Sequence, residues 1–543
     1  MTLLAGRALT KSFGSRLILD GADLAVEPQA RIGVIGPNGS GKSTLLKILA
    51  ELESPDSGEV SRRRGTRIAY LDQHPVGDER TPLETVLAAR PDLVELDREL
   101  ISLGAQLGRD EVIADLGRMA RVIARQEEVL ERFEAAGGPS AEGRARASLL
   151  EIGLSAEELT LPTHTLSGGQ RKLIALAACL EQQPDVLLLD EPEAHLDNAG
   201  RARVELLARR FEGAIVAVSH DRYLLDEIVT QVASLERGRI RLWTGNYSAY
   251  ILERELEVQR QQQAFVTQQK EIERLEAAIA RFKLWASWVP DKRNIRQANN
   301  KQRQIDRMVT VDRPVLERRK IALRLRPTTR GGQRVFELRS VGVSFDGDPV
   351  LTDIDLDVWH GERVGIVGRN GAGKSVLLKT LVGQIAPSAG EVWVGPSISI
   401  GYLAQEQDTL DPASTPLETV RRAVPVSEGD AVSLLMKFLF PYEQVRRANR
   451  LLSGGERTRL QLLLLMVAKP NLLVLDEPTN HLDIESVEVL ETAIEEFTGT
   501  VVAISHDRYF LDRIADRIVE VDGGIRTATG GYSAWIESTA TKV

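Results

Sequence analysis

The same pattern of twenty residues occurs twice in this sequence, 332 positions apart. RIGVIGPNGSGKSTLLKILA at residues 31–50 matches RVGIVGRNGAGKSVLLKTLV at residues 363–382. In both copies a β-rich run leads into a glycine-rich turn, after which apolar residues recur at helical spacing. A strand–turn–helix unit of this kind is typical of α/β folds, and the repeat distance is far too long for a solenoid. The pattern therefore predicts two equivalent α/β domains in tandem.

Three further segments recur in the same order behind each copy. They are LSGGQ at 166–170 with LSGGE at 452–456, VLLLDEP at 186–192 with LLVLDEP at 472–478, and VSHDRYLLD at 218–226 with ISHDRYFLD at 504–512. A chain of 543 residues is too long for one hydrophobic core, so its length also agrees with a tandem of complete domains.

The first copy carries 46 residues that the second lacks. Gln73 lies 94 residues before Ser167, whereas Gln405 lies only 48 residues before Ser453, and the other separations match. The surplus falls within about residues 90–140, a stretch rich in Leu, Ala, Glu and Arg at helical spacing. We therefore expect a helical hairpin, or arm, that protrudes from the first domain.

About 80 residues, 250–330, separate the two copies. The first 33 of them contain neither Gly nor Pro, which predicts a helix about 50 Å long. Apolar residues recur at spacings of three, four and seven before Pro290 and at spacings of three and seven after it, as expected for two helices that face each other. These apolar residues are Phe265, Ile272, Leu275, Ile279 and Phe282 before the proline, and Ile295, Ala298, Ile305 and Met308 after it. We predict a long antiparallel helix pair with a short apex near residues 284–292. The predicted domains are 1–249 with the arm at about 90–140, the helical linker 250–330, and 331–543.

Composition and hydropathy exclude several classes of protein. With 43% hydrophobic and 27% charged residues, the chain is expected to fold rather than to be disordered. The longest apolar run, residues 460–468, is well short of the roughly 18 residues of a membrane span, and the N-terminus lacks the apolar core of a signal peptide. The single cysteine, Cys179, excludes an internal disulfide and is expected to fill a helix core, which agrees with a reducing, cytoplasmic location.

The duplicated glycine-rich turn has the residues that a phosphate-binding loop needs. Glycines allow backbone N–H groups to curl around phosphate oxygens, the lysine neutralises charge on the β- and γ-phosphates, and the serine hydroxyl reaches Mg²⁺ at a helix N-terminus. The predicted nucleotide-binding residues are Gly36, Pro37, Asn38, Gly39, Ser40, Gly41, Lys42, Ser43 and Thr44 in the first copy and Gly368, Arg369, Asn370, Gly371, Ala372, Gly373, Lys374, Ser375 and Val376 in the second.

Each apolar strand that ends in Asp-Glu supplies two carboxylates to this region. Asp190 and Asp476 are candidate metal ligands, and the following residues, Glu191 and Glu477, are candidates for polarising an attacking water. The repeat also pairs two candidate γ-phosphate contacts at matched distances from LSGG, His220 and His506.

Taken together, these motifs resemble one family. The tandem phosphate loops, the LSGG[QE] signature, DEPTNHLD at 476–483, SHDRYFLD at 505–512 and the long charged linker closely resemble the ABC-F subfamily of ATP-binding cassette proteins over essentially the whole chain. The resemblance implies a Mg-dependent ATPase in which two α/β P-loop cassettes, joined by the helical linker, pair within one monomeric chain. Each of two ATP molecules would lie between one phosphate loop and the LSGG signature of the other cassette.

The resemblance also assigns roles to residues outside the phosphate loops. Phe13 and Phe345 match the aromatic residue that stacks on adenine, with core packing as the alternative for these rings. The expected signature contacts are Ser453, Gly454, Gly455 and Glu456 for the ATP held by Lys42, and Ser167, Gly168, Gly169 and Gln170 for the ATP held by Lys374. The expected Mg²⁺ ligands are Ser43, Gln73 and Asp190 in one site and Ser375, Gln405 and Asp476 in the other.

The first copy departs from the family pattern at two positions. Where the second copy reads EPTNHLD, the first reads EPEAHLD, with Glu193 and Ala194 in place of Thr and Asn. Glu191 and His195 are retained, so hydrolysis at this half-site is not excluded. We hypothesise that the extra carboxylate and the lost amide weaken coupling across the interface and make the two sites unequal.

Positive charge is concentrated in the linker. Residues 281–326 contain 14 basic and 4 acidic residues, a net charge of +10, whereas the whole chain has a net charge of −9. Such a segment in an acidic protein is typical of a surface that binds a phosphate backbone, and a solvated helix pair is the alternative interpretation. Aromatic residues beside arginines suit stacking on unpaired bases. The candidate RNA-binding residues are Arg281, Lys283, Trp285, Trp288, Lys292, Arg293 and Arg296.

The resemblance implies binding to the ribosome, with the linker directed toward tRNA and the arm toward ribosomal protein or RNA. Two roles stay open, a general translation factor and protection against ribosome-targeting antibiotics, and the apex of about nine residues favours the first. The alternative from another class is the ATP-binding subunit of a membrane transporter, which would need a membrane partner and leaves the basic linker without a purpose. Action on branched DNA is less favoured, because the relatives concerned carry an added C-terminal coiled coil.

Overall fold

The computed structural model describes residues 2–14, 16–288, 292–308, 332–404, 410–438, 440–480 and 482–540. The chain divides into two compact units. One unit holds both copies of the repeat, Met1–Asn246 with Ile321–Val543, and the other is Tyr247–Lys320. We call the two copies cassette 1 and cassette 2.

Each cassette is built on a six-stranded sheet with the same strand order in both copies. In cassette 1 the order is β5 (Ile68–Leu71), β6 (Val186–Asp190), β7 (Ala214–Val218), β3 (Arg31–Ile35), β8 (Gln231–Glu236) and β9 (Arg239–Thr244). In cassette 2 it is β14 (Ile400–Leu403), β15 (Leu472–Asp476), β16 (Thr500–Ile504), β12 (Arg363–Val367), β17 (Arg517–Asp522) and β18 (Gly524–Thr529). Only the last pair in each sheet is antiparallel. Strands β6 and β15 are buried at every position, as is typical of parallel strands covered on both faces.

A three-stranded antiparallel sheet completes each cassette. Its strands are β2 (Arg16–Val26), β1 (Leu4–Phe13) and β4 (Ser57–Arg62) in cassette 1, and β11 (Asp348–Trp359), β10 (Arg334–Phe345) and β13 (Ala389–Val394) in cassette 2. Leu4 of β1, Leu45 of α1 (Lys42–Leu49) and Val216 of β7 belong to one buried apolar core. The same core recurs in cassette 2 around α12 (Lys374–Leu381). Each phosphate-loop helix is therefore held between two sheets.

The remaining helices of the cassettes surround this core. Cassette 1 has α2 (Pro82–Ala88), α6 (Ala141–Glu151), α7 (Gly168–Glu181), α8 (Asn198–Arg210), α9 (Arg222–Ile228) and the 3-10 turns η1 (Gly138–Ser140), η2 (Glu158–Thr160) and η3 (Thr163–Thr165). Cassette 2 has α13 (Pro416–Ala423), α14 (Glu428–Lys437), α15 (Gly454–Ala468), α16 (Ile484–Glu495), α17 (Arg508–Ile514), α18 (Tyr532–Ala540) and the 3-10 turn η4 (Asn449–Leu451).

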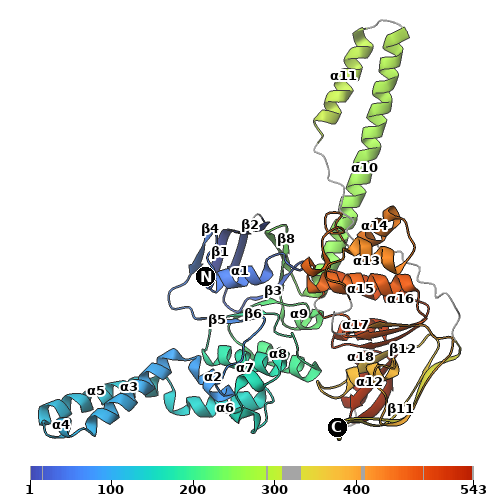
Figure 1. Cartoon of the computed structure of the whole chain (residues 1–543). Helices are drawn as coiled ribbons and strands as arrows, with labels where there is room; N and C mark the ends of the chain where they lie inside the picture. The colour runs from blue at the N-terminus through green and yellow to red at the C-terminus, as the bar shows by residue number, and fades with distance from the viewer. Residues whose placement is uncertain are drawn as a thin grey trace. The chain divides into compact units, whose positions relative to one another are not determined.

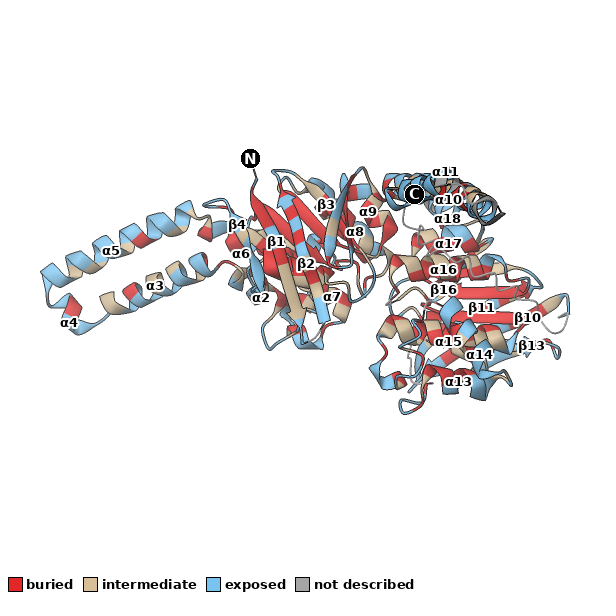
Figure 2. Ribbon diagram, turned by 90° about the horizontal axis from the view of Figure 1, so that it is seen from above, coloured by how far each residue is buried: buried red, intermediate tan, exposed pale blue. Residues whose placement is uncertain are grey.

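The extra residues of cassette 1 form a pair of long helices. Helices α3 (Pro91–Leu107) and α5 (Leu116–Ala135) lie side by side, and the short α4 (Asp110–Ile113) joins them at the far end (Figure 1). Most of their surface is exposed (Figure 2), and Leu103 and Val129 are among the few buried side chains.

The second unit is a helix pair, which confirms the long antiparallel linker. Helix α10 (Tyr247–Trp288) has 42 residues and packs against α11 (Lys292–Asp306), which has 15. Leu275, Ile279 and Ala298 of the predicted seam are buried. Helix α10 stays helical through Trp288, so it extends into the range predicted for the apex, near residues 284–292. No Gly or Pro interrupts it before Pro290. The basic residues predicted beyond position 308 lie outside the described residues.

Two buried ion pairs between the cassettes are related by the repeat. Arg222, in the SHDRY segment of cassette 1, pairs with Glu491 on α16 of cassette 2, and Arg508 in turn pairs with Glu205 on α8. The exposed fractions of these side chains are 6% and 0% in the first pair and 7% and 12% in the second. Because buried charges of this kind need their partners, the pairs fix the edge at which the two cassettes meet.

The tyrosines that follow these arginines strengthen the same edge. The rings of Tyr223 and Tyr509 meet edge to face with their centroids 5.7 Å apart. The Arg222 guanidinium lies over the Tyr509 ring at 5.0 Å, and that of Arg508 lies over the Tyr223 ring at 4.7 Å. Each cassette thus contributes an arginine and an aromatic ring to the other.

Replacing Glu205 by Leu should leave Arg508 buried without its carboxylate. We expect the free energy of unfolding to fall by about 3–5 kcal/mol, and the exchange Glu205→Arg with Arg508→Glu should recover part of the loss. Chemical denaturation followed by tryptophan fluorescence measures the effect. The control, Glu151→Leu, breaks the exposed pair with Arg210 and should cost about 1 kcal/mol or less. Equal effects of the two single substitutions would contradict the role given to the buried pair.

Candidate functional site

The glycine-rich turn of each cassette contains a position that only glycine can occupy. Gly41 directly precedes α1 with a φ of 102°, and an added Cβ would lie 2.3 Å from Ile18 Cγ2. Gly373 precedes α12 with a φ of 91°, and its Cβ would lie 2.8 Å from Leu351 Cδ2. Both the left-handed backbone and the close packing exclude a side chain at these positions. The other predicted loop residues also lie between the strand and the helix of their cassette, and they are Gly36, Pro37, Gly39 and Ser40 in the first and Gly368, Arg369, Gly371 and Ala372 in the second.

The two loop lysines fold back over their own loops. Lys42 Nζ donates to the carbonyl oxygens of Gly36 at 2.7 Å and Pro37 at 3.1 Å. Lys374 Nζ donates to the equivalent carbonyls of residues 368 and 369, both at 2.9 Å. Burial lowers the pKa of both ammonium groups, so an anion bound in either loop would gain a desolvated positive charge.

A serine hydroxyl and an aspartate meet beside each lysine. Ser43 Oγ donates to Asp190 Oδ1 at 3.1 Å, and Ser375 Oγ donates to Asp476 Oδ1 at 3.2 Å. Burial raises the pKa of both aspartates. Asp476 Oδ2 is buried without a hydrogen-bond partner. Hard oxygen ligands of this kind, one of them unpaired, fit a Mg²⁺ ion.

The residue after each aspartate is held in a strained conformation. Glu191 and Glu477 have φ angles of 46° and 50°, in the left-handed region that side chains rarely adopt. Their amides donate to Val218 O at 2.8 Å and Ile504 O at 3.0 Å, respectively, which ties each turn to the neighbouring strand. The same strain at both positions directs the carboxylates toward the segment after β7 or β16.

Each strained glutamate lies near a histidine of that segment. His220 Nε2 is 3.6 Å from Glu191 Oε1, and His506 Nε2 is 3.4 Å from Glu477 Oε1. Burial and Lys42 lower the pKa of His220 to about 4, and burial and Lys374 hold that of His506 well below its usual value. Both imidazoles are therefore neutral at pH 7. Both ring nitrogens of His220 are buried without a hydrogen-bond partner, as expected of groups that contact a ligand.

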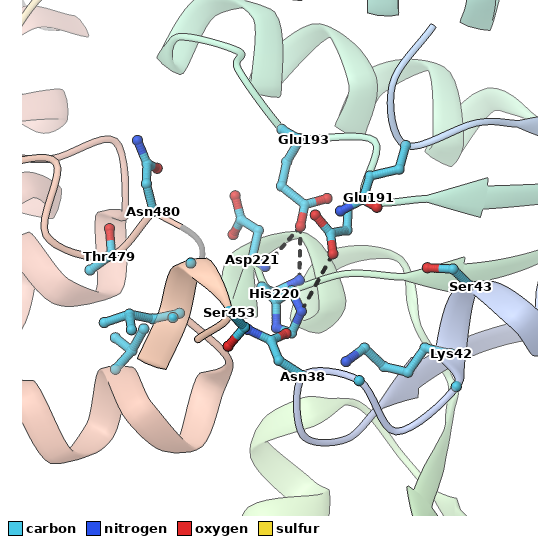
Figure 3. A pocket seen from close by; sticks show the side chains of 18 of the residues that line it. Asn38, Lys42, Ser43, Glu191, Glu193, His220, Asp221, Ser453, Thr479 and Asn480 are labelled. Atoms are coloured by element: carbon cyan, nitrogen blue, oxygen red, sulfur yellow. Dashed lines mark hydrogen bonds and ion pairs between the residues drawn. The ribbon is translucent and has the colours of Figure 1, made fainter. Parts of the chain in front are cut away.

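The side chains of the cassette 1 set open into a cavity of about 600 Å³ that both cassettes line (Figure 3). Cassette 1 contributes Lys42, Ser43, Glu191 and His220, and cassette 2 contributes Ser453, with Gly454 and Gly455 beside it. The first phosphate loop thus faces the LSGG signature of the other cassette, the arrangement that the family resemblance implies. The volume is within the usual range for a small-molecule site.

Both LSGG serines cap helices. The Ser167 hydroxyl accepts a hydrogen bond from the Gln170 amide at the start of α7, and Ser453 accepts one from the Glu456 amide at the start of α15. The Gln170 and Glu456 side chains accept hydrogen bonds from the serine amides in return. The first turn of α7 therefore contains Gly168 and Gly169, and the first turn of α15 contains Gly454 and Gly455. The N-terminus of each helix favours an anion.

Two aspartates that the sequence analysis did not select join the cassettes at this site. Asp483 Oδ2 accepts from the Asn38 amide at 3.0 Å, and Asp197 Oδ2 accepts from the Asn370 amide at 3.3 Å. Asn370 Nδ2 also donates to His195 O at 3.2 Å. Each aspartate also caps the helix that follows it. The repeated HLD triplet was the available sequence signal, because both of its aspartates stand at matched positions.

The remaining predicted nucleotide contacts lie as follows. Phe13, Thr44 and Gln73 line the cavity, and Phe13 is half exposed, so its ring is accessible for stacking. Phe345 is also half exposed, whereas Val376 packs against the core of cassette 2. Gln405 lies outside the described residues.

Four of the predicted RNA-binding residues are exposed on the linker helices. Arg281 and Lys283 lie near the end of α10, and Arg293 and Arg296 lie near the start of α11. The side chains of Trp285, Trp288 and Lys292 lie outside what the structure describes. Across the part of the chain that is described, no helix combines the length and the apolar character that a bilayer span requires.

Comparison with known proteins gives consistent matches. Two family models described as ABC transporter match the chain, one at residues 19–194 and 351–480 and the other at residues 233–325. The chain is 34% identical to the energy-dependent translational throttle protein EttA of Mycobacterium tuberculosis, over 95% of this chain and 91% of that protein. It is 33% identical to ABC transporter F family member 5 of Arabidopsis thaliana, over 97% of this chain and 76% of that protein. Among solved structures, RNase-L Inhibitor matches with a TM-score of 0.62 at 19% identity, covering 98% of this chain and 93% of that chain, which supports the fold.

Replacing Gly41 by Ala should abolish triphosphate binding in the first loop. The left-handed backbone and the contact with Ile18 both oppose a Cβ, so the loop cannot keep its shape. Titration with a fluorescent nucleoside triphosphate, in a chain whose second loop carries Gly373→Ala, isolates the loss. Gly104→Ala is the control, because this glycine lies inside helix α3 with nothing within 4 Å of an added Cβ. It should leave binding unchanged and stabilise the arm by about 1 kcal/mol.

Proposed function

The chain belongs to the ABC-F subfamily of ATP-binding cassette proteins and is an ATPase, and on this basis we propose that it hydrolyses ATP at two composite sites to act on the translating ribosome. The observation that carries the proposal is the cavity in which Lys42, Ser43, Glu191 and His220 of one cassette face Ser453 of the other. A triphosphate bound there would contact both halves of the chain, so its presence would favour their closed pairing.

The residues of this cavity would divide the work of hydrolysis. Backbone amides of the loop and Lys42 would bind the phosphates, and the first turn of α15 would approach the γ-phosphate from the opposite cassette. Ser43 and Asp190 would hold Mg²⁺, which neutralises phosphate charge when bound. Glu191 would polarise the attacking water, and the neutral His220 ring would contact the γ-phosphate. The matched residues of cassette 2 would do the same around Lys374.

Two observations support the ribosome as the target. The relative EttA is named as a translational throttle protein, and the match covers nearly all of both chains. The linker carries exposed arginines and a net charge of +10 over residues 281–326, which suits a phosphate backbone. We propose that linker movement on ATP binding acts near tRNA, as a translation factor or in protection against antibiotics.

The two matching family models are described as ABC transporter, which favours one second candidate, an ATP-binding subunit of a transporter. Such a subunit would need a membrane partner. Co-sedimentation of the protein with ribosomes, set against recovery in a membrane fraction, distinguishes the two candidates.

Replacing both Glu191 and Glu477 by Gln should trap the protein on ribosomes when ATP is present. The substitutions keep the side-chain shape but remove the carboxylates that would polarise water, so kcat should fall by at least about 100-fold while ATP binding persists. Co-sedimentation with ATP and with ADP measures the trapping. Glu212→Gln is the control, because this glutamate is exposed and lies outside the cavity. ATP-independent sedimentation of the double variant would contradict the proposal.

Reversing the charge of Arg293 and Arg296 to Glu should weaken ribosome binding. Two lost phosphate contacts would lower the affinity and reduce its dependence on salt, since the salt slope follows the number of neutralised phosphates. The same reversal at the exposed Arg63 and Arg64 of cassette 1 is the matched control and should have a smaller effect. Binding isotherms at three salt concentrations test this, and equal losses from both double variants would argue against the linker as the contact surface.

A further inference from the structure

Glu193, the carboxylate that distinguishes cassette 1, is buried and holds the segment after β7. Its Oε1 accepts hydrogen bonds from Ser219 Oγ and the His220 amide, both at 2.8 Å, and from the Asp221 amide at 3.3 Å. Figure 3 shows this carboxylate pointing toward His220 and Asp221, beside Glu191. Three donors on one buried oxygen fix the position of the segment that carries the histidine.

The equivalent segment of cassette 2 is held in a different way. Thr479 stands in place of the glutamate, and its hydroxyl lies 3.2 Å from Ser505 Oγ. The His506 amide instead donates to Oε2 of Glu477 at 3.3 Å. The Glu477 side chain is consequently drawn back, with an exposed fraction of 6% against 22% for Glu191.

Lys172 fixes two further segments around the same site. It is 2% exposed, and its Nζ donates to the carbonyl oxygens of Asp72, Gln73 and Asp190, each at 2.9 Å. It therefore ties the ends of β5 and β6 together. Cassette 2 has Thr458 at this position, with its hydroxyl bonded to a carbonyl of its own helix. A threonine is too short to span these segments.

Cassette 1 has both the lysine and the glutamate, whereas cassette 2 has threonine at both equivalent positions. Burial lowers the pKa of Lys172, and the charge of Glu193 is the strongest of the carboxylates that oppose this shift. Burial, with the charges of Asp221 and Glu191, raises the pKa of Glu193 to about 7. The negative charge of Glu193 therefore offsets part of the desolvation of Lys172, which agrees with the presence of both residues in cassette 1.

We propose that Lys172 and Glu193 are positioning residues that keep the Lys42 site ready for hydrolysis. Glu193 takes over the histidine amide, so Glu191 is left facing the cavity. At the Lys374 site, Glu477 must first release the amide of His506. The Lys42 site is therefore the faster of the two, opposite in direction to the weakening hypothesised from the sequence. This inference rests on the proposed roles of Glu191 and Glu477 in hydrolysis.

The test isolates one site at a time. Glu477→Gln leaves the Lys42 site active, and Glu191→Gln leaves the Lys374 site active, and the first variant should show the higher kcat. In the Glu477→Gln background, Glu193→Thr should lower kcat about three- to tenfold with little change in KM, as expected for one or two lost hydrogen bonds. Glu193→Gln keeps the accepting oxygen and should restore most of that loss.

The reciprocal change supplies the matched control. In the Glu191→Gln background, Thr479→Glu together with Thr458→Lys should raise kcat at the Lys374 site. Thermal denaturation of each variant shows which variants are folded. The comparison of the two single-site backgrounds requires no substitution at position 172 or 193. Equal kcat values in those two backgrounds, or no response to Glu193→Thr in a folded protein, would overturn the inference. Absence of ATP hydrolysis in the unmodified chain would instead refute the proposed function.

Discussion

The crossed pairing of Arg222 with Glu491 and of Arg508 with Glu205 is the constraint on which the shared cavity depends. Each arginine lies two residues after the histidine of its SHD segment, and His220 of cassette 1 lines the cavity. The segment that carries this histidine is therefore anchored in the other cassette. Parting the cassettes along this edge would strand buried charges, whereas rotation about it would not. Opening and closing around a nucleotide are therefore expected to occur as a hinge motion with this edge as its axis.

The two sites share one backbone and differ in side chains. In both, a left-handed glycine precedes the helix after the glycine-rich turn, a strained glutamate follows an aspartate, and a serine hydroxyl donates to that aspartate. This backbone geometry determines which groups a bound nucleotide would contact, and it is the same in both sites. Among the differences are two buried groups of cassette 1, Lys172 and Glu193, which adjust how firmly the neighbouring segments are held.

The repeat was enough to predict the two α/β cassettes, because long motifs at matched spacing fix both the elements and their order. The helical linker was predicted from the absence of Gly and Pro in the first 33 residues of the segment between the copies. The expectation that Lys42 faces Ser453 came from the family resemblance and not from a pattern in the residues. The crossed arginines were not predicted, since SHDRY appears as a local motif and nothing in a linear sequence states which distant glutamate is buried beside it. The role of Lys172 was missed for the same reason, because its three acceptors are backbone carbonyls, which leave no trace in residue identity.

The crossed arginines also affect how such a chain can vary over generations. Each half carries the partner of a buried charge in the other half. The effect of a substitution at Glu205 or Glu491 therefore depends on an arginine that lies 303 or 269 positions away, respectively. A half taken from another protein would fit only if it brought a glutamate and an arginine at the matching places. The two halves have the same fold, yet neither can be exchanged without the residues that pair with its buried charges in the other half.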